Sequence, residues 1–166
     1  MNKKYTDFLF IFHSTQDQKN LIDKLLSSTN LENIEVISDE KIKEHILEKS
    51  IFAVAKSGTI SIEICNKNIP SIIIYKMNFI NFIIIKILVK IKFANIINIA
   101  ADKMIIPELL QSKCNPQEIF KTVSSFIENP EKISKQIKET ENILDSFKTK
   151  SLPTDLASDA LRKNLS

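Results

Sequence analysis

IFAVAKSGTISIEICNKNIPSIIIY, residues 51–75, is the stretch that decides the fold. It opens with an apolar run at residues 51–55 and closes with nearly continuous isoleucine at residues 71–75. Short apolar runs of this kind are typical of strands that are covered on both faces of a sheet. Between them, Ser-Gly-Thr at residues 57–59 marks a turn, and the sequence up to about Asn66 predicts a helix. The stretch therefore predicts two parallel strands joined by a helix.

The alternation of apolar runs and amphipathic stretches continues on both sides of this segment. Two Asn-Pro pairs, Asn115-Pro116 and Asn129-Pro130, each resemble an N-cap followed by proline at the first helical position. Together the elements predict an α/β fold with a Rossmann-like, doubly wound parallel sheet and extra C-terminal helices. The further elements predicted are strands over residues 8–12 and 34–37 and helices over residues 15–28, 39–48, 116–127, 130–147 and 155–165.

Length and composition agree with one folded domain. The chain has 166 residues, of which 43% are hydrophobic and 26% are charged, so it can bury a core and is not expected to be disordered. The net charge of +3 is small, which argues against nucleic acid as a partner. We expect residues 1–150 to form the Rossmann-like domain and residues 151–166 to add a C-terminal helix.

The sparse cysteines and histidines predict neither a metal site nor a disulfide. Cys65 and Cys114 lie far apart without a CxxC motif, so we expect two reduced thiols in a cytoplasmic protein. His13 and His45 have no neighbouring ligand residues, and we expect structural roles for both. No uncharged apolar segment reaches the roughly 18–20 residues that a membrane-spanning helix needs.

The turn after the strand at residues 51–55 is the best candidate for ligand binding. In open α/β sheets, ligands bind at the carboxyl ends of the strands, where a helix N-terminus offers N–H groups to an anion. Gly58 has no Cβ, so a phosphate can approach the backbone closely, and the Ser57 and Thr59 hydroxyls add hydrogen bonds. Glu63 lies one turn further, where its carboxylate can accept bonds from two ribose hydroxyls. An ordinary capped helix with a solvated Glu63 remains the alternative.

A second signal is an asymmetry of charge, because no acidic residue occurs between Ile64 and Ala101. A basic and strongly apolar stretch of this length favours a helix lying on an anionic membrane surface. A buried helix with lysines that extend to its edges is the alternative. The candidate membrane-surface residues are Lys76, Phe79, Phe82, Lys86, Lys90 and Lys92.

A third signal is a set of polar residues further along the chain. Asn98 is expected in a loop, and Glu108 and Gln111, three residues apart at an expected helix start, lie on one helical face. By themselves these residues predict only capping or solvent contact.

In order and spacing, these residues together resemble the lipid-A-disaccharide synthase family, and specifically its C-terminal domain. The resemblance covers about residues 5–147. One departure is Tyr75-Lys76, where the family usually has Tyr-Arg. The matching motifs are Lys56-Ser57-Gly58-Thr59 with Glu63, Asn68-Ile69-Pro70, Tyr75-Lys76, Leu88-Val89-Lys90, Asn98-Ile99-Ala100-Ala101, Pro107-Glu108-Leu109-Leu110-Gln111, Cys114 and Pro116.

The resemblance implies a two-domain GT-B glycosyltransferase of lipid A biosynthesis at the inner face of the cytoplasmic membrane. Such an enzyme joins UDP-2,3-diacylglucosamine to 2,3-diacylglucosamine 1-phosphate, releases UDP and needs no metal or other cofactor. Residues 1–150 would bind the UDP-sugar. By the resemblance, the diphosphate is held by Ser57, Gly58 and Thr59 and the ribose by Glu63, while Asn98, Glu108 and Gln111 line the same cleft.

The family's general base and acceptor surface belong to its N-terminal domain, which has no counterpart in this sequence. The resemblance therefore implies no catalytic residue here, a chain inactive alone, and a separately encoded N-terminal half as partner. Two alternatives remain. One is a non-catalytic remnant that binds nucleotide or membrane. The other is a related UDP-N-acetylglucosamine transferase of peptidoglycan synthesis, which the Pro107–Gln111 run disfavours.

Overall fold

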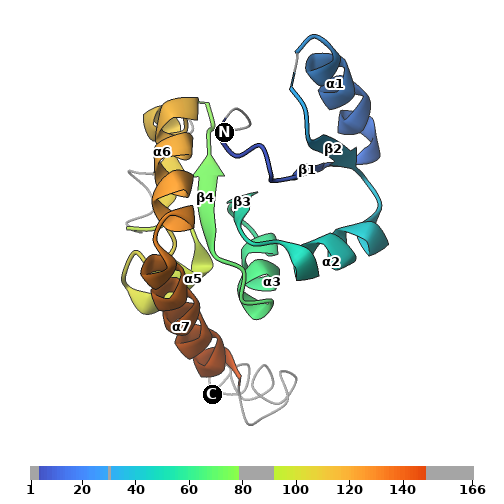
Figure 1. Ribbon diagram of the computed structural model, residues 1–166. Coiled ribbons are helices and arrows are strands. Elements are labelled where there is room, and N and C mark those ends of the chain that lie inside the picture. Colours follow the sequence, from blue (N-terminus) through green and yellow to red (C-terminus); the bar gives the residue numbers. More distant parts are fainter. Residues whose placement is uncertain (1–3, 30, 79–91, 149–166) are drawn as a thin grey trace. The chain divides into compact units, whose positions relative to one another are not determined.

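Strands and helices alternate along the computed structural model, which describes residues 4–29, 31–78 and 92–148 (Figure 1). The chain divides into two units, Met1–Ile51 and Phe52–Ser166, here called the N-terminal unit and the C-terminal unit. All strand pairs among the described residues are parallel. This arrangement confirms the predicted α/β fold class, and the grouping of residues 1–150 into one domain stays a prediction.

The N-terminal unit is built around one pair of parallel strands. In the register of β1 and β2, Phe10 lies opposite Ile34. The second helix begins after Asp39, whose carboxylate accepts the backbone N–H groups of Lys41 and Ile42 at 2.7 and 3.2 Å. The elements are β1 (Phe10–His13), α1 (Gln16–Ser27), β2 (Ile34–Ile37) and α2 (Glu40–Lys49).

The C-terminal unit contains a three-stranded parallel sheet in the order β3-β4-β5. Lys56 lies opposite Ile74, and Tyr75 opposite Leu110, so the strands end at one edge of the sheet. This edge positions the candidate site. The elements are β3 (Ala53–Lys56), α3 (Ile60–Asn66), β4 (Ser71–Tyr75), α5 (Ile96–Ala101), β5 (Glu108–Leu110), the 3-10 helix η1 (Gln111–Lys113), α6 (Pro116–Ile127) and α7 (Pro130–Phe147).

The core of the C-terminal unit lies between the sheet and helices α3, α5 and α7. Its buried members are Cys65, Ile73, Ile97, Ile106 and Leu144. Because Leu144 comes from α7, the long C-terminal helix is part of this core and also contacts α3, α5 and α6.

A buried glutamine attaches α7 to the start of β4. The Gln136 side chain is 4% exposed, and its oxygen accepts the backbone N–H of Ser71 at 2.7 Å. Its nitrogen donates to the carbonyls of Ser71 and Ile105 at 3.0 and 3.2 Å. The amide thus satisfies backbone groups where the strand begins, which would be costly to bury without a partner.

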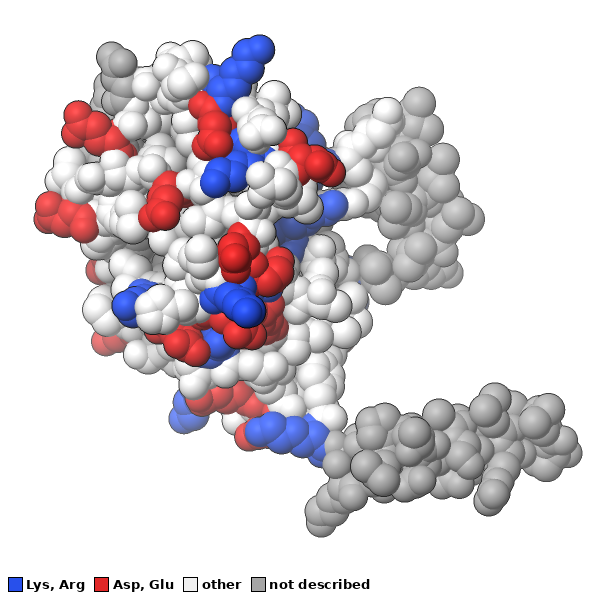
Figure 2. All heavy atoms as spheres, turned by 90° about the vertical axis from the view of Figure 1, so that its right-hand side faces the viewer, with Lys and Arg blue, Asp and Glu red and all other residues white. Residues whose placement is uncertain are grey.

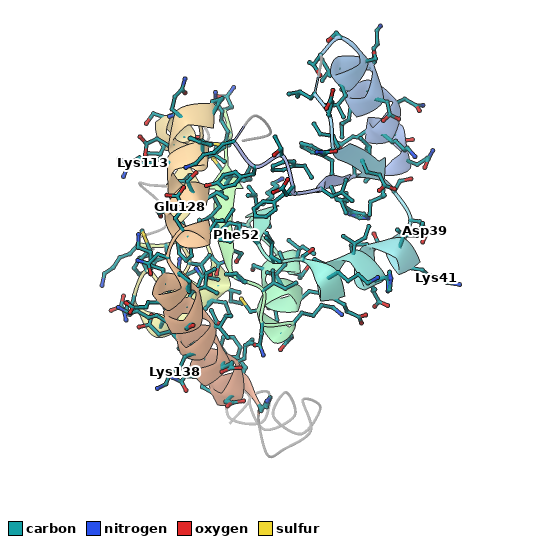
Figure 3. All side chains as sticks on the ribbon, viewed as in Figure 1. Asp39, Lys41, Phe52, Lys113, Glu128 and Lys138 are labelled. Carbon is teal, nitrogen blue, oxygen red and sulfur yellow. The ribbon has the colours of Figure 1, made fainter. Side chains whose placement is uncertain are left out.

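Helices α6 and α7 begin and end where the sequence predicts. The Asn115 side chain accepts the backbone N–H of Glu118 at 3.0 Å, and the Asn129 side chain accepts that of Glu131 at 3.1 Å. The proline that follows each cap has no N–H to leave unpaired, which explains the sharp helix starts. Phe52, at the beginning of the C-terminal unit, packs on Phe126 of α6 with ring centroids 5.6 Å apart (Figure 3).

The strands at residues 34–37 and 71–75 are confirmed at their predicted bounds, whereas two others are displaced toward the C-terminus. β1 covers Phe10–His13 instead of residues 8–12, because the N–H of Phe8 turns back to the Tyr5 carbonyl. β3 covers Ala53–Lys56 instead of residues 51–55, because its pairing begins with the hydrogen bond from the Ala53 N–H to the Pro70 carbonyl. Backbone pairing, rather than hydrophobicity, sets these bounds.

Two local predictions around the third motif are wrong. Asn98 lies inside helix α5 rather than in a loop, because the Asn95 side chain caps that helix by accepting the Ile97 N–H at 2.9 Å. Glu108 begins strand β5 rather than a helix, because residues 108–110 pair with β4. A strand of three residues is too short to show a period of two in the sequence.

Several predicted features lie outside the described residues. They are the membrane-surface candidates Phe79, Phe82, Lys86 and Lys90 and the helix at residues 155–165. Among the residues that are described, no helix combines the length and the apolar character needed to cross a bilayer.

Candidate functional site

The candidate site begins at the turn from β3 to α3, at the carboxyl edge of the sheet. Gly58 has a φ of +154°, a backbone conformation that residues with a side chain rarely adopt. An added Cβ would meet no atom within 4 Å, so the backbone faces open space rather than a packed neighbour. Glycine is therefore required here by the backbone conformation, and the space beside it is available to a ligand.

This turn presents consecutive backbone donors. The N–H groups of Ser61 and Ile62 bond to the carbonyls of Gly58 and Thr59 at 3.1 and 3.0 Å. In the part of the chain that the structure describes, the N–H groups of Gly58, Thr59 and Ile60 make no hydrogen bond. Three neighbouring N–H groups at an exposed turn form an arrangement that suits an anion such as phosphate.

The Ser57 hydroxyl is already engaged within the protein. Its Oγ donates to the carbonyl of Ala94 at 2.7 Å, across 37 residues of sequence. This bond joins the β3–α3 turn to the segment that leads into α5. Because the hydroxyl proton is directed at Ala94, Ser57 has only its oxygen lone pairs left for other partners.

Glu63 lies beside the turn on the surface of α3. It is half-buried and, together with Thr59, borders an open hollow of about 550 Å³. That volume is within the range of small-molecule sites, although this hollow is wide and shallow. The remaining lining residues are Ile62, Asn66 and Lys67.

Asn98 and Glu108 form a buried network next to this turn. Asn98 is completely buried, and its oxygen accepts the N–H groups of Ile105 and Ile106 at 2.8 and 2.9 Å. Its nitrogen donates to the Ile106 carbonyl at 2.7 Å and to Glu108 Oε1 at 2.8 Å. The Glu108 carboxylate also accepts the N–H groups of Ala94 and Asn95 at 2.8 and 2.9 Å.

Gln111 follows β5 and holds the segment that leaves β4. Its φ is +51°, in the left-handed region. Its side-chain oxygen accepts the Met77 N–H at 2.9 Å, and its nitrogen donates to the Met77 carbonyl at 3.3 Å. Gln111 borders a second hollow, of about 250 Å³, with Lys76, Met77, Ser112, Cys114 and Asn115.

The structure thus distributes the predicted donor-binding residues over three places. Thr59 and Glu63 border the hollow on α3, and Gln111 lies at the second hollow. Ser57 and Glu108 both bond to the segment before α5, and Asn98 of α5 bonds to Glu108. The backbone of Ala94 is the element that sequence reasoning missed, since a backbone group leaves no signal in the residue types.

Lys56 is part of the motif at the turn, but the sequence assigned no role to its side chain. Its Nζ lies over the Tyr75 ring, 5.1 Å from the centroid, at the carboxyl ends of β3 and β4. A cation held on an aromatic face at this edge adds positive charge beside the turn.

The buried Cys65 thiol is not a reactive nucleophile. Burial raises the pKa of the Cys65 thiol to about 11, so this thiol stays neutral and unreactive near pH 7. Within the described residues, no three His, Cys, Asp or Glu side chains are grouped closely enough to hold a metal ion.

His13 lies at the end of β1 in the N-terminal unit and takes part in a surface cluster. Its Nε2 is 3.4 Å from Glu40, and Lys43 Nζ is 2.6 Å from the same carboxylate. The hydrogen bond from Lys43 is the main cause that lowers the pKa of Glu40. On the face shown in Figure 2, acidic and basic side chains are interspersed rather than separated by sign.

Comparison with known proteins gives one consistent result. Residues 1–158 match the family described as lipid-A-disaccharide synthetase. The lipid-A-disaccharide synthase of Rickettsia bellii (strain OSU 85-389) is 38% identical over 130 residues, which are 77% of this chain and 34% of that protein. Its counterpart in Rickettsia canadensis (strain McKiel) is 34% identical over 164 residues, 92% of this chain and 42% of that protein.

The enzyme of the same name from Rickettsia prowazekii (strain Madrid E) is 31% identical over 166 residues, 98% of this chain and 43% of that protein. The chain thus spans less than half the length of these relatives, as a C-terminal portion would. With the parallel α/β architecture and the motif order from Ser57 to Gln111, these matches show that the chain belongs to the lipid-A-disaccharide synthetase family.

Proposed function

We propose that this chain supplies the donor-binding part of a glycosyltransferase of lipid A biosynthesis. The reaction would join UDP-2,3-diacylglucosamine to 2,3-diacylglucosamine 1-phosphate and release UDP. Membership of the family supports this proposal. The observation that carries it is the row of N–H groups at Gly58, Thr59 and Ile60, which make no hydrogen bond within the described residues and lie next to the hollow that Glu63 borders.

In this proposal the turn binds the diphosphate and α3 binds the ribose. The three N–H groups donate to phosphate oxygens, and the absence of a side chain at Gly58 lets them approach. Thr59 adds its hydroxyl, and Lys56 adds positive charge nearby. A carboxylate at Glu63 accepts hydrogen bonds from the ribose hydroxyls, which are neutral donors and tolerate a negative partner.

Asn98, Glu108 and Gln111 shape the site in this proposal without their side chains being free for the ligand. Their polar atoms bond mainly to neighbouring backbone. The remaining length of the family's enzymes would supply acceptor binding and the general base. In this proposal an N-terminal half of the family's kind supplies that part as a partner. We propose that the assembled enzyme works peripherally at the inner face of the cytoplasmic membrane, where its acylated substrates lie.

Two measurements test the proposal. Titration calorimetry of the 166-residue chain should show UDP binding, and ADP should bind less tightly. Transfer assays should yield disaccharide only when the chain is combined with an N-terminal half of a family member. No UDP binding would refute the donor role. UDP binding with no product from the combination would favour the non-catalytic alternative, and N-acetylglucosamine transfer would favour the peptidoglycan enzyme.

A further inference from the structure

Glu108 is a buried carboxylate that is stabilised by hydrogen bonds from N–H groups. The residue is 8% exposed, and its two oxygens accept three N–H groups, from Ala94, Asn95 and the Asn98 side chain, at 2.8–2.9 Å. Removing a carboxylate from water is costly unless such donors replace the lost hydration. The position is therefore built to hold a negative charge against this backbone segment.

That backbone segment is also the partner of the candidate site. Glu108 accepts the N–H of Ala94, while the carbonyl of the same residue accepts the Ser57 hydroxyl at 2.7 Å. Ala94 is thus held from both ends, by β5 on one side and by the β3–α3 turn on the other. A continuous chain of hydrogen bonds runs from the carboxylate to the turn that presents the N–H groups.

We infer that Glu108 is a positioning residue for the nucleotide diphosphate, acting through Ala94 and Ser57 rather than by contact with the donor. The inference rests on the proposed donor site. Direct contact is disfavoured by charge, because a carboxylate repels a diphosphate. It is also disfavoured by geometry, because both oxygens are already accepting N–H groups.

The substitution Glu108→Gln separates these possibilities because it retains the shape and replaces one acceptor oxygen by an NH2 group. Whichever way the amide turns, a donor faces a donor, and the hold on the Ala94–Asn95 backbone weakens. Glu131→Gln is the matched control, since Glu131 is exposed in the first turn of α7. Ser57→Ala cuts the other end of the chain of hydrogen bonds.

We expect Glu108→Gln to weaken UDP binding roughly three- to tenfold, the size of one net hydrogen bond. The control should bind as the parent chain does. In the Ser57→Ala background, Glu108→Gln should cause little further loss, because the connection is already cut. A purely structural defect would instead add its full effect in both backgrounds.

A second readout does not depend on UDP. In the parent chain, amide exchange should be slow at Ala94 and Asn95, whose N–H groups Glu108 accepts. Ser57→Ala should accelerate exchange there, and this holds even if Glu108→Gln fails to fold. The inference would be overturned if amide exchange were unchanged in Ser57→Ala. It would also be overturned if the losses of UDP affinity from Ser57→Ala and Glu108→Gln simply added in the double variant. Altered exchange without any UDP binding by the parent chain would overturn the donor role and leave the hydrogen-bonded connection standing.

Discussion

At the scale of single residues, the site depends on what each side chain is already bonded to. The Ser57 hydroxyl and the Glu108 carboxylate both form hydrogen bonds with the Ala94 backbone. Glu63 borders the hollow beside the turn. We therefore propose a direct role in ligand binding for the turn and for Glu63, which lines the hollow, and a role in fixing the turn for the buried residues.

Replacing Glu63 by alanine should weaken UDP binding substantially. A hydrogen bond to a charged group contributes roughly 1.5–3 kcal/mol, which corresponds to about ten- to a hundredfold in the dissociation constant. Calorimetry measures the effect, with Glu141→Ala, at an exposed position of α7, as the control. An unchanged dissociation constant in Glu63→Ala would show that the ribose role is wrong.

Cys65 should make the free energy of unfolding depend on pH in the alkaline range. Burial raises its pKa from 9.0 to about 11, so between these values the unfolded chain loses this proton before the folded chain does. Since the folded state then binds more protons, stability should fall as pH rises from about 9 to about 11.

Urea unfolding at several pH values, compared between the parent chain and Cys65→Ala, measures this dependence. The free energy of unfolding of the parent chain, relative to that of Cys65→Ala, should decrease as pH rises across that range. A constant difference would show that the thiol titrates normally in the folded state.

At the scale of elements, α7 determines how the C-terminal unit is held together. It contributes Leu144 to the core and Gln136 to the start of β4. The helix is long and largely exposed, so its few inward side chains carry its attachment. The Gln136 amide is the most specific of them because it pairs with both backbone groups of Ser71.

Gln136→Leu should lower the free energy of unfolding by about 2 kcal/mol or more. The substitution keeps an apolar volume but leaves the N–H and carbonyl of Ser71 buried without these partners. Chemical denaturation measures the loss. Lys138→Leu, on the same helix but at an exposed position labelled in Figure 3, should change stability by no more than about 0.5 kcal/mol. Equal effects of the two would contradict the role given to the amide.

At the scale of the whole molecule, the proposed lipid A function requires a way for the chain to meet acylated substrates at a membrane. The stretch from Lys76 to Lys92 has four lysines and no acidic residue, although Lys92 is 2.9 Å from Asp102 in the structure. That ion pair is exposed and therefore weak, so it still permits attraction to anionic lipid.

This stretch should bind anionic vesicles reversibly, more strongly at low than at high salt. The Debye length falls from about 10 Å at 0.1 M salt to about 3 Å at 1 M, which removes the attraction between lysines and headgroups. Sedimentation with vesicles measures binding. Replacing Lys86, Lys90 and Lys92 by Gln should weaken it at low salt, whereas the same replacement of Lys132, Lys135 and Lys138 on α7 should not. Equal binding to neutral and anionic vesicles would contradict the electrostatic attraction, and no binding to either would indicate that the stretch is buried.

The sequence by itself determined the class of fold and the place of the turn. Apolar runs at residues 34–37 and 71–75 and the Asn-Pro caps are local signals, because hydrophobicity and capping act within a few residues. For the same reason, the unique glycine at residue 58 pointed to the turn where the backbone adopts a positive φ.

Only the tertiary structure decided which partners the polar side chains take. Ser57 reaches Ala94 across 37 residues and Gln136 reaches Ser71 across 65, and no local pattern encodes such distances. Strand β5 likewise forms because its three residues pair with the edge of β4. Hydrogen bonds between distant segments form only after the chain has folded. The sequence therefore indicated Glu108 as a candidate site residue, and the fold determined that its carboxylate accepts the N–H groups of Ala94 and Asn95.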